Sequence, residues 1–149
     1  MSVGQFCNRE VIIARRKDPV PELARLMRQY HVGDLVVVES IDAPVPVGLV
    51  TDRDLVVEVM AQEVEPAAVT AGDVMSIDLL VARESDGLWE TLKRMRARAV
   101  RRVPVVDDQH GRLVGIIAVD DVLELLTDEL SALARIPFRG RDLEQETRK

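Results

Sequence analysis

One stretch of this sequence occurs twice. Residues 14–38 and residues 82–106 align without a gap at an offset of 68, and nine of the 25 aligned positions are identical. Unrelated sequences would share roughly one or two such positions at average residue usage. The offset falls to 67 beyond a hairpin turn, where loop length varies freely. A duplication of this length predicts two similar units that complete a common core.

The hydrophobic pattern of each copy predicts the order β-α-β-β-α. Apolar runs rich in β-branched residues indicate strands, and apolar positions at helical spacing indicate helices. Residues 35–38 are apolar at every position, which favours a strand covered on both faces. We therefore expect an α/β (α+β) fold in which two repeats pack sheet to sheet about a pseudo-two-fold axis. The predicted strands are residues 11–15, 35–38 and 47–50, and then 79–83, 103–106 and 113–117.

The helix that follows the first strand of each repeat has recognisable start signals. Asp18 before Pro19 predicts an N-cap and a first helical position, and Ser85 or Asp86 is expected to cap the equivalent helix. The first of these helices should end near His31. The stripes expected to face the core are Val20, Leu23, Ala24, Met27 and Tyr30, and then Leu88, Leu92, Met95 and Ala99.

Changes in composition mark the boundaries of the repeats. We assign residues 7–65 to the first repeat, 66–78 to a linker and 79–134 to the second repeat. The residues up to Asn8 show no clear period. Residues 135–149 are highly charged and are expected to form a flexible tail.

Composition also narrows the classes of function. The single Cys7 excludes an internal disulfide, and two distant histidines argue against a histidine-rich metal site. We see no signal region and no apolar run near the ~18 residues of a membrane span, so we expect a soluble, cytoplasmic protein that does not bind a membrane. A formal net charge of −6 disfavours binding to nucleic-acid phosphates. Because no catalytic motif or constellation is recognisable, we do not expect an enzyme.

The third strand of each repeat runs into an acidic turn that opens a helix. The first example is Gly48–Asp54 and the second is Gly115–Asp121, 67 residues later. Thr51 or Asp52 can cap the helix amides that follow. The hydroxyl and the free amides can instead hold a phosphate, while Asp54 can accept hydrogen bonds from a ribose diol. On sequence alone, both interpretations stay open.

Together with the segments Arg101–Asp107 and Asp73–Met75, these motifs resemble the cystathionine-β-synthase (CBS) domain pair, or Bateman module, over roughly residues 7–134. The resemblance implies two clefts that bind adenine nucleotides. The first would use Asp54 for ribose, Thr51 for phosphate, and Val11, Ile13, Val32, Gly33, Asp34 and Leu35 around adenine. Arg53, inside the same motif, can reach a phosphate as a fork of donors or pair with a nearby carboxylate, and both interpretations stay open. The second would use Asp121 for ribose, Arg101 and Arg102 for phosphate, and Leu79, Val81, Val100 and Val103 around adenine.

The two motifs differ at the positions that matter for phosphate. Ala118 stands where the first motif has Thr51, and Asp120 places a negative charge where phosphate would approach. Loss of one hydrogen bond to a charged group costs about 1.5–3 kcal/mol. The first site is therefore expected to bind nucleotide more tightly than the second.

The favoured hypothesis is a stand-alone sensor of adenine nucleotide that has no catalytic cofactor. AMP is the simplest ligand, with ADP, ATP or NAD(H) as alternatives, and the output would pass through a homodimer or an effector protein. Two other functions stay open. One is a dimerising scaffold that needs no ligand. The other is a nucleic-acid-binding regulator that uses the basic cluster Lys93–Arg102, although its helical cations point away from the apolar stripe.

Overall fold

The computed structural model describes residues 1–148, without the side chains of residues 137–142. The chain divides into a first unit, Met1–Ile117, and a second unit that begins at Ala118. Among the described residues, no helix has the length and apolar character needed to span a membrane.

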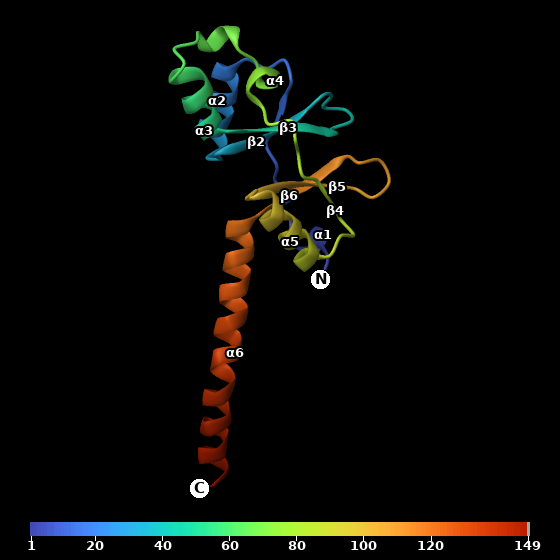
Figure 1. Cartoon of the computed structure of the whole chain (residues 1–149). Helices are drawn as coiled ribbons and strands as arrows, with labels where there is room; N and C mark the ends of the chain where they lie inside the picture. The colour runs from blue at the N-terminus through green and yellow to red at the C-terminus, as the bar shows by residue number, and fades with distance from the viewer. Residues whose placement is uncertain (149) are drawn as a thin grey trace. The chain divides into compact units, whose positions relative to one another are not determined.

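The first repeat forms a three-stranded sheet with the order β1-β2-β3 (Figure 1). Strand β1 pairs in parallel with β2, and β2 pairs antiparallel with β3. This is the predicted β-α-β-β-α order, except that the last helix begins as α3 and continues as the π-helix η1. The elements are β1 (Ile13–Arg15), α2 (Val20–Tyr30), β2 (Asp34–Val38), β3 (Pro46–Thr51), α3 (Asp52–Asp54) and η1 (Leu55–Met60).

The second repeat has the same order, with a sheet β4-β5-β6. Its first strand is shorter than predicted, because only two residues of β4 pair with β5. Its last helix, α6, belongs to the second unit of the chain. The elements are β4 (Ala82–Arg83), α5 (Leu88–Arg98), β5 (Arg102–Val106), β6 (Leu113–Ala118) and α6 (Val119–Thr147).

Strand β2 lies between two layers of side chains. Leu35 and Val37 pack into the core formed with α2, whereas Val36 and Val38 pack against Ile116 of the second sheet. These four side chains are all fully buried. The predicted burial on both faces and the predicted packing of sheet against sheet are thereby confirmed.

The predicted helix stripes are correct at their centres and wrong at their margins. Val20, Leu23 and Met27 are buried in α2, whereas Ala24 and Tyr30 are exposed. In α5, Leu88 and Met95 are buried, but Leu92 is only half-buried and Ala99 is exposed. The residues that are not buried as predicted lie at the edge of the stripe or at the helix end, where the neighbouring elements do not cover them.

The predicted N-caps are also wrong. Helix α2 has Pro19 at its N-cap position, and α5 has Gly87. The Asp18 carboxylate instead accepts a hydrogen bond from the Arg15 backbone N–H at 2.8 Å. The Asp86 carboxylate accepts the equivalent bond from Arg83 at 3.0 Å. Each aspartate therefore stabilises the turn between strand and helix and does not cap the helix.

The structure contains one repeated element that the sequence did not reveal. Helix α1 (Val3–Phe6) and helix α4 (Ala71–Val74) stand at the same offset of 68, and each starts with a capping box. Gly4 N–H donates to Glu84 of the second repeat, and Gly72 N–H donates to Arg16 of the first. The two helices are thus exchanged between the repeats. This repeat cannot be seen in the sequence, because the two helical segments are four residues long and have only the glycine in common.

The predicted flexible tail has helical structure. Helix α6 continues through residue 135 to Thr147, and Arg148 N–H donates to the Glu144 carbonyl at 3.1 Å. Leucine, glutamate and glutamine at residues 143–146 have high helix propensity, which accounts for a helix in so charged a segment.

Candidate functional site

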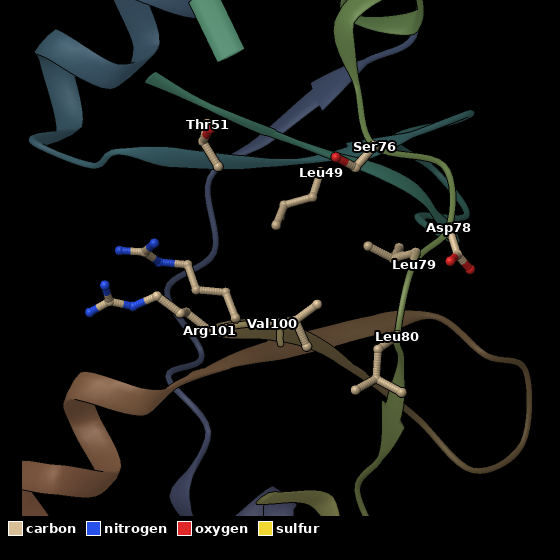
Figure 2. A pocket seen from close by; sticks show the side chains of 9 residues that line it. Leu49, Thr51, Ser76, Asp78, Leu79, Leu80, Val100 and Arg101 are labelled. Carbon is tan, nitrogen blue, oxygen red and sulfur yellow. The ribbon is translucent and has the colours of Figure 1, made fainter. Parts of the chain in front are cut away.

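A pocket of about 230 Å³ opens in the first unit, where the end of β3 approaches the segments before β4 and β5 (Figure 2). Its lining combines three parts of the chain that are far apart in sequence. The lining residues are Leu49 and Thr51 of β3, Ser76, Asp78, Leu79 and Leu80 after α4, and Val100, Arg101 and Arg102 at the start of β5.

The middle of the pocket is apolar. Figure 2 shows the side chains of Leu49, Leu79 and Val100 pointing toward one another across the cavity. Leu80 contributes a further aliphatic wall. Aliphatic side chains around a narrow cavity favour a flat apolar group such as a heteroaromatic ring, because burial removes its faces from water.

One end of the pocket carries groups that can bind an anion. Figure 2 shows Thr51 and Arg101 at this end, away from Asp78. Thr51 is the last residue of β3 and Arg102 is the first residue of β5, so the two repeats each supply part of the polar end. A hydroxyl beside guanidinium groups suits a phosphate, which accepts several charge-assisted hydrogen bonds.

The opposite end carries one acidic residue, Asp78, which forms an ion pair. Asp78 Oδ1 lies 2.6 Å from Nη2 of Arg98 in α5, and the Asp78 side chain is 92% exposed. This carboxylate faces solvent and is already paired, so it gives the pocket an acidic rim rather than a buried negative charge.

Thr51 and Asp54 form a capping box. Thr51 Oγ1 accepts the Asp54 N–H at 3.2 Å, and Asp54 Oδ2 accepts the Thr51 N–H at 2.8 Å. Of the two predicted caps, Thr51 is confirmed, whereas Asp52 is the first residue of the helix. The capping role does not exclude a ligand role for Thr51, because the cap uses a lone pair of the hydroxyl and leaves its O–H available as a donor.

Arg102 is held by an acidic residue of the other repeat. Its Nε lies 2.8 Å from Asp34 Oδ1, and the two side chains are 34% and 16% exposed. The pair joins the first residue of β5 to the first residue of β2. Asp34 and Arg102 occupy equivalent positions of the two repeats at the offset of 68, so the duplicated fold places opposite charges at matching positions.

The structure groups the predicted site residues differently from the sequence. The pocket takes Thr51 from the predicted first site and Leu79, Val100, Arg101 and Arg102 from the predicted second site. This pocket therefore combines residues that the prediction divided between two sites. The packing of sheet against sheet brings the end of β3 close to the start of β5.

The remaining predicted residues do not line this pocket. Leu35 and Val103 are fully buried, and their assignment as adenine walls stays a prediction. Val11 and Ile13 pack between the sheets beside Val36 and Val38. Arg53 and Asp121 are exposed, and their roles stay predictions, as do those of Asp54, Val32, Gly33, Asp34 and Val81 as direct ligand contacts.

Four lining residues escaped sequence reasoning, namely Leu49, Ser76, Asp78 and Leu80. Leu49 lies inside the recognised motif, but its apolar character indicated only a buried strand. The other three follow α4, in a segment that pairs with β3 through mutual Ser76 and Leu49 backbone hydrogen bonds. The available signal was the alternation of apolar Met75, Ile77 and Leu79 with polar residues, which is typical of a strand.

The repeat offset shows that the anion-binding groups are unevenly shared. The positions equivalent to Thr51, Arg101 and Arg102 are Ala118, Gly33 and Asp34. The three pocket residues therefore supply a hydroxyl and two cations, whereas the three equivalent residues supply a methyl group, a hydrogen atom and a carboxylate.

Among the described residues, no group of three or more His, Cys, Asp or Glu side chains could hold a metal ion.

Comparison with known proteins gives the family. A model described as the CBS domain matches residues 3–61 and 71–128. Protein MK0525 of Methanopyrus kandleri is 36% identical over 125 residues, which are 84% of this chain and 62% of that protein. The chain thus spans less than two thirds of this relative.

Two further relatives extend the match. The CBS domain-containing protein YhcV of Bacillus subtilis is 31% identical over 121 residues, 81% of this chain and 82% of that protein. The CBS domain pair of protein MJ0100, solved in complex with 5′-methylthioadenosine and S-adenosyl-L-methionine, superposes with a TM-score of 0.74 at 23% identity, covering 87% of this chain and 98% of that one. With two matched repeats in two paired sheets, this chain belongs to the CBS-domain family.

Proposed function

We propose that this chain is a cytoplasmic, non-enzymatic regulatory module that binds an adenine nucleotide, most simply AMP, in the pocket between β3 and β5. The observation that carries this proposal is the lining, which sets an apolar slot beside one hydroxyl and two guanidinium groups. Such a site matches a heteroaromatic base at one end and a phosphate at the other. The proposed ligand class is inferred from the lining of this pocket, because the likeness to the MJ0100 pair supports only the fold.

The pocket volume favours a mononucleotide over a larger ligand. About 230 Å³ lies below the ~300–1,000 Å³ of sites that enclose drug-sized molecules. A base with its ribose and one phosphate would fill the slot and reach the polar end. A second nucleotide half, as in NAD(H), would extend beyond it into solvent.

Calorimetry on the purified, ligand-free chain tests the proposal directly. We expect AMP to bind with measurable heat and ATP and NADH to bind more weakly. Absence of heat and of a thermal shift at millimolar concentrations of all three nucleotides would refute the sensor function.

A pair of substitutions at Thr51 tests the assigned phosphate end. Thr51→Val keeps the shape and removes the hydroxyl, so AMP affinity should fall roughly ten- to a hundred-fold, as expected for a lost hydrogen bond to a charged group. Thr51→Ser retains the hydroxyl and should bind AMP like the wild type. Adenosine affinity should change little in either variant, and an equal loss for adenosine would place the hydroxyl away from the phosphate.

A second function, a dimerising scaffold, has its own supporting observation. Large apolar side chains are exposed on η1 and on the following turn, including Met60 at 69%, and on α6, including Leu130 at 66%. We infer that the module forms a homodimer and passes its signal to an effector protein. Light scattering with and without AMP distinguishes the functions, because a pure scaffold would give the same dimer and the same stability in both.

Binding to nucleic acid is the weakest of the three functions. Of the six cations in the cluster Lys93–Arg102, at least four are engaged in ion pairs, namely Lys93 with Glu90, Arg94 with Asp86, Arg98 with Asp78 and Arg102 with Asp34. Paired cations release fewer counterions when they meet a phosphate backbone. The pairing therefore leaves the cluster with less free positive charge than its sequence indicates.

A further inference from the structure

We propose that Asp34 determines the charge selectivity of the pocket, so that affinity falls as the negative charge of the nucleotide increases. This inference rests on the proposed function and adds a residue that does not itself line the cavity. Asp34 would set how much of the positive charge of Arg102 is available to a ligand.

The position of Asp34 brings its carboxylate to the polar end of the pocket. Asp34 and Thr51 are direct partners in the antiparallel pairing of β2 and β3. Directly opposed residues project from the same face of a sheet, with Cβ atoms roughly 5 Å apart. On that face the Asp34 carboxylate meets Nε of Arg102 at 2.8 Å. Asp34 is therefore adjacent to two of the groups assigned to phosphate.

The ion pair leaves part of Arg102 available. A guanidinium carries five N–H donors, and the observed contact with Asp34 uses the Nε edge. The terminal nitrogens can still donate to a phosphate without breaking the pair. The carboxylate nevertheless offsets one of the two positive charges supplied by Arg101 and Arg102, and its side chain is only 16% exposed.

The energetic effect depends on the charge of the ligand. Repulsion between Asp34 and a phosphate grows with each negative charge, and partial burial weakens the screening by water. Adenosine carries no phosphate and would not experience it. The repulsion is therefore expected to increase in the order adenosine, AMP, ADP, ATP. In this way Asp34 would limit the charge of the ligand that the pocket accepts.

Substitution by asparagine isolates this effect. Asp34→Asn preserves the shape and an acceptor oxygen for Arg102 Nε but removes the charge. We expect it to tighten AMP binding by about tenfold, ADP and ATP by more, and adenosine by less than about twofold. Isothermal titration calorimetry with the four ligands measures the four ratios. Asp34→Ser, which also lacks the charge, provides a second variant if the first is not folded by circular dichroism.

Glu39→Gln is the matched control. The Glu39 carboxylate pairs with Nε of Arg16 at the same distance of 2.8 Å, neither residue lines the pocket, and the substitution changes net charge by the same amount. It should leave all four affinities unchanged.

The outcomes separate the inference from the proposed function. If the ratio of Asp34→Asn affinity to wild-type affinity is the same for all four ligands, the inference is overturned. It is also overturned if Asp34→Asn binds the phosphate-bearing ligands more weakly than the wild type, because the carboxylate would then serve to position Arg102. If the wild type binds none of the four ligands, the proposed function fails, and the charge selectivity fails with it.

Discussion

At the scale of single residues, Gly115 occupies a place that no side chain can share. A Cβ at this position would lie 2.6 Å from Cys7 Sγ and 2.9 Å from the Asn8 carbonyl oxygen. Asn8 and Ile116 exchange two backbone hydrogen bonds next to this contact, at 2.8 and 2.9 Å. Gly48 meets Met75 at the equivalent place in the other repeat. The glycine of each motif is therefore explained by close chain packing, and not by a ligand.

Gly115→Ala should lower the free energy of unfolding by about 1–3 kcal/mol, because the added methyl group must displace backbone as well as the Cys7 thiol. Urea denaturation measures the change. Gly87→Ala is the control, since its Cβ would meet nothing closer than Glu90 Cβ at 4.0 Å and its φ is −68°. It should shift stability by less than ~0.5 kcal/mol, because the entropy of the unfolded chain and the N-cap preference act in opposite directions. Equal effects would contradict the packing argument.

Asp107 makes the stability of the second hairpin depend on pH. Its carboxylate accepts backbone N–H groups from His110, Gln109 and Arg112. The hydrogen bond from His110 is the main cause that lowers the pKa of Asp107. Desolvation opposes it, and the bonds from Arg112 and Gln109 lower the pKa further. A lowered pKa in the folded state means that the unfolded chain binds the proton more readily.

The contribution of Asp107 is therefore present above its ordinary pKa of ~3.9 and is lost as pH falls through the lowered pKa of the folded state. Asp107→Asn should reduce stability at neutral pH and flatten the decline in acid. Urea midpoints measured from neutral pH to well below the ordinary pKa check this. Asp42→Asn, in the exposed β2–β3 loop, is the control, and a flattening of the same size there would contradict the role of Asp107.

At the scale of elements, sequence reasoning succeeded where a local pattern decides the structure. Strand β2 was predictable because four consecutive apolar residues require cover on two faces. Helix α1 was not, because a single turn has no period to detect. Thr51, Arg101 and Arg102 were each predicted to bind phosphate, but their meeting in one pocket depends on which strand ends face each other. That information is tertiary and has no local signal.

The starts of α3 and α6 differ in a way that can be tested by a gain of stability. Thr51 caps α3 together with Asp54, whereas Ala118 at the N-cap of α6 makes no side-chain hydrogen bond. The two residues have similar backbone angles, with φ of −109° and −115°. Asp121 already stands at the third helical position of α6, as Asp54 does in α3. By residue type, the start of α6 lacks only the hydroxyl of a capping box.

Ala118→Thr should therefore complete this capping box and raise the free energy of unfolding by ~0.5–2 kcal/mol. Thermal and urea denaturation measure the gain. The combined variant Ala118→Thr with Asp121→Ala is the control, because it keeps the hydroxyl but lacks its reciprocal partner, and it should lose part of the gain. A neutral result for Ala118→Thr alone would mean that the two helix starts are not equivalent in geometry.

At the scale of the whole first unit, each repeat is completed by a segment that precedes the other. Residues 2–8 pack on the second repeat through Val3, Gly4 and Asn8, and residues 70–76 pack on the first through Ala71, Gly72 and Ser76. The exchange links the N-terminus to β6, more than a hundred residues away. The two repeats should consequently unfold together rather than as independent halves.

Val3→Ala tests this exchange, because the Val3 side chain is fully buried although it lies two residues from the N-terminus. Loss of its methyl groups should cost about 1 kcal/mol or more and should loosen residues 2–8 from the second repeat. Hydrogen exchange measured amide by amide should then show faster exchange at Asn8, whose N–H is bonded to Ile116. The Ser76 amide, bonded in the same way to Leu49, is the internal control and should keep its protection against local opening. Equal acceleration at both amides would show that Val3 stabilises the unit only as a whole, whereas selective acceleration at Asn8 would establish the N-terminal segment as a structural part of the distant repeat.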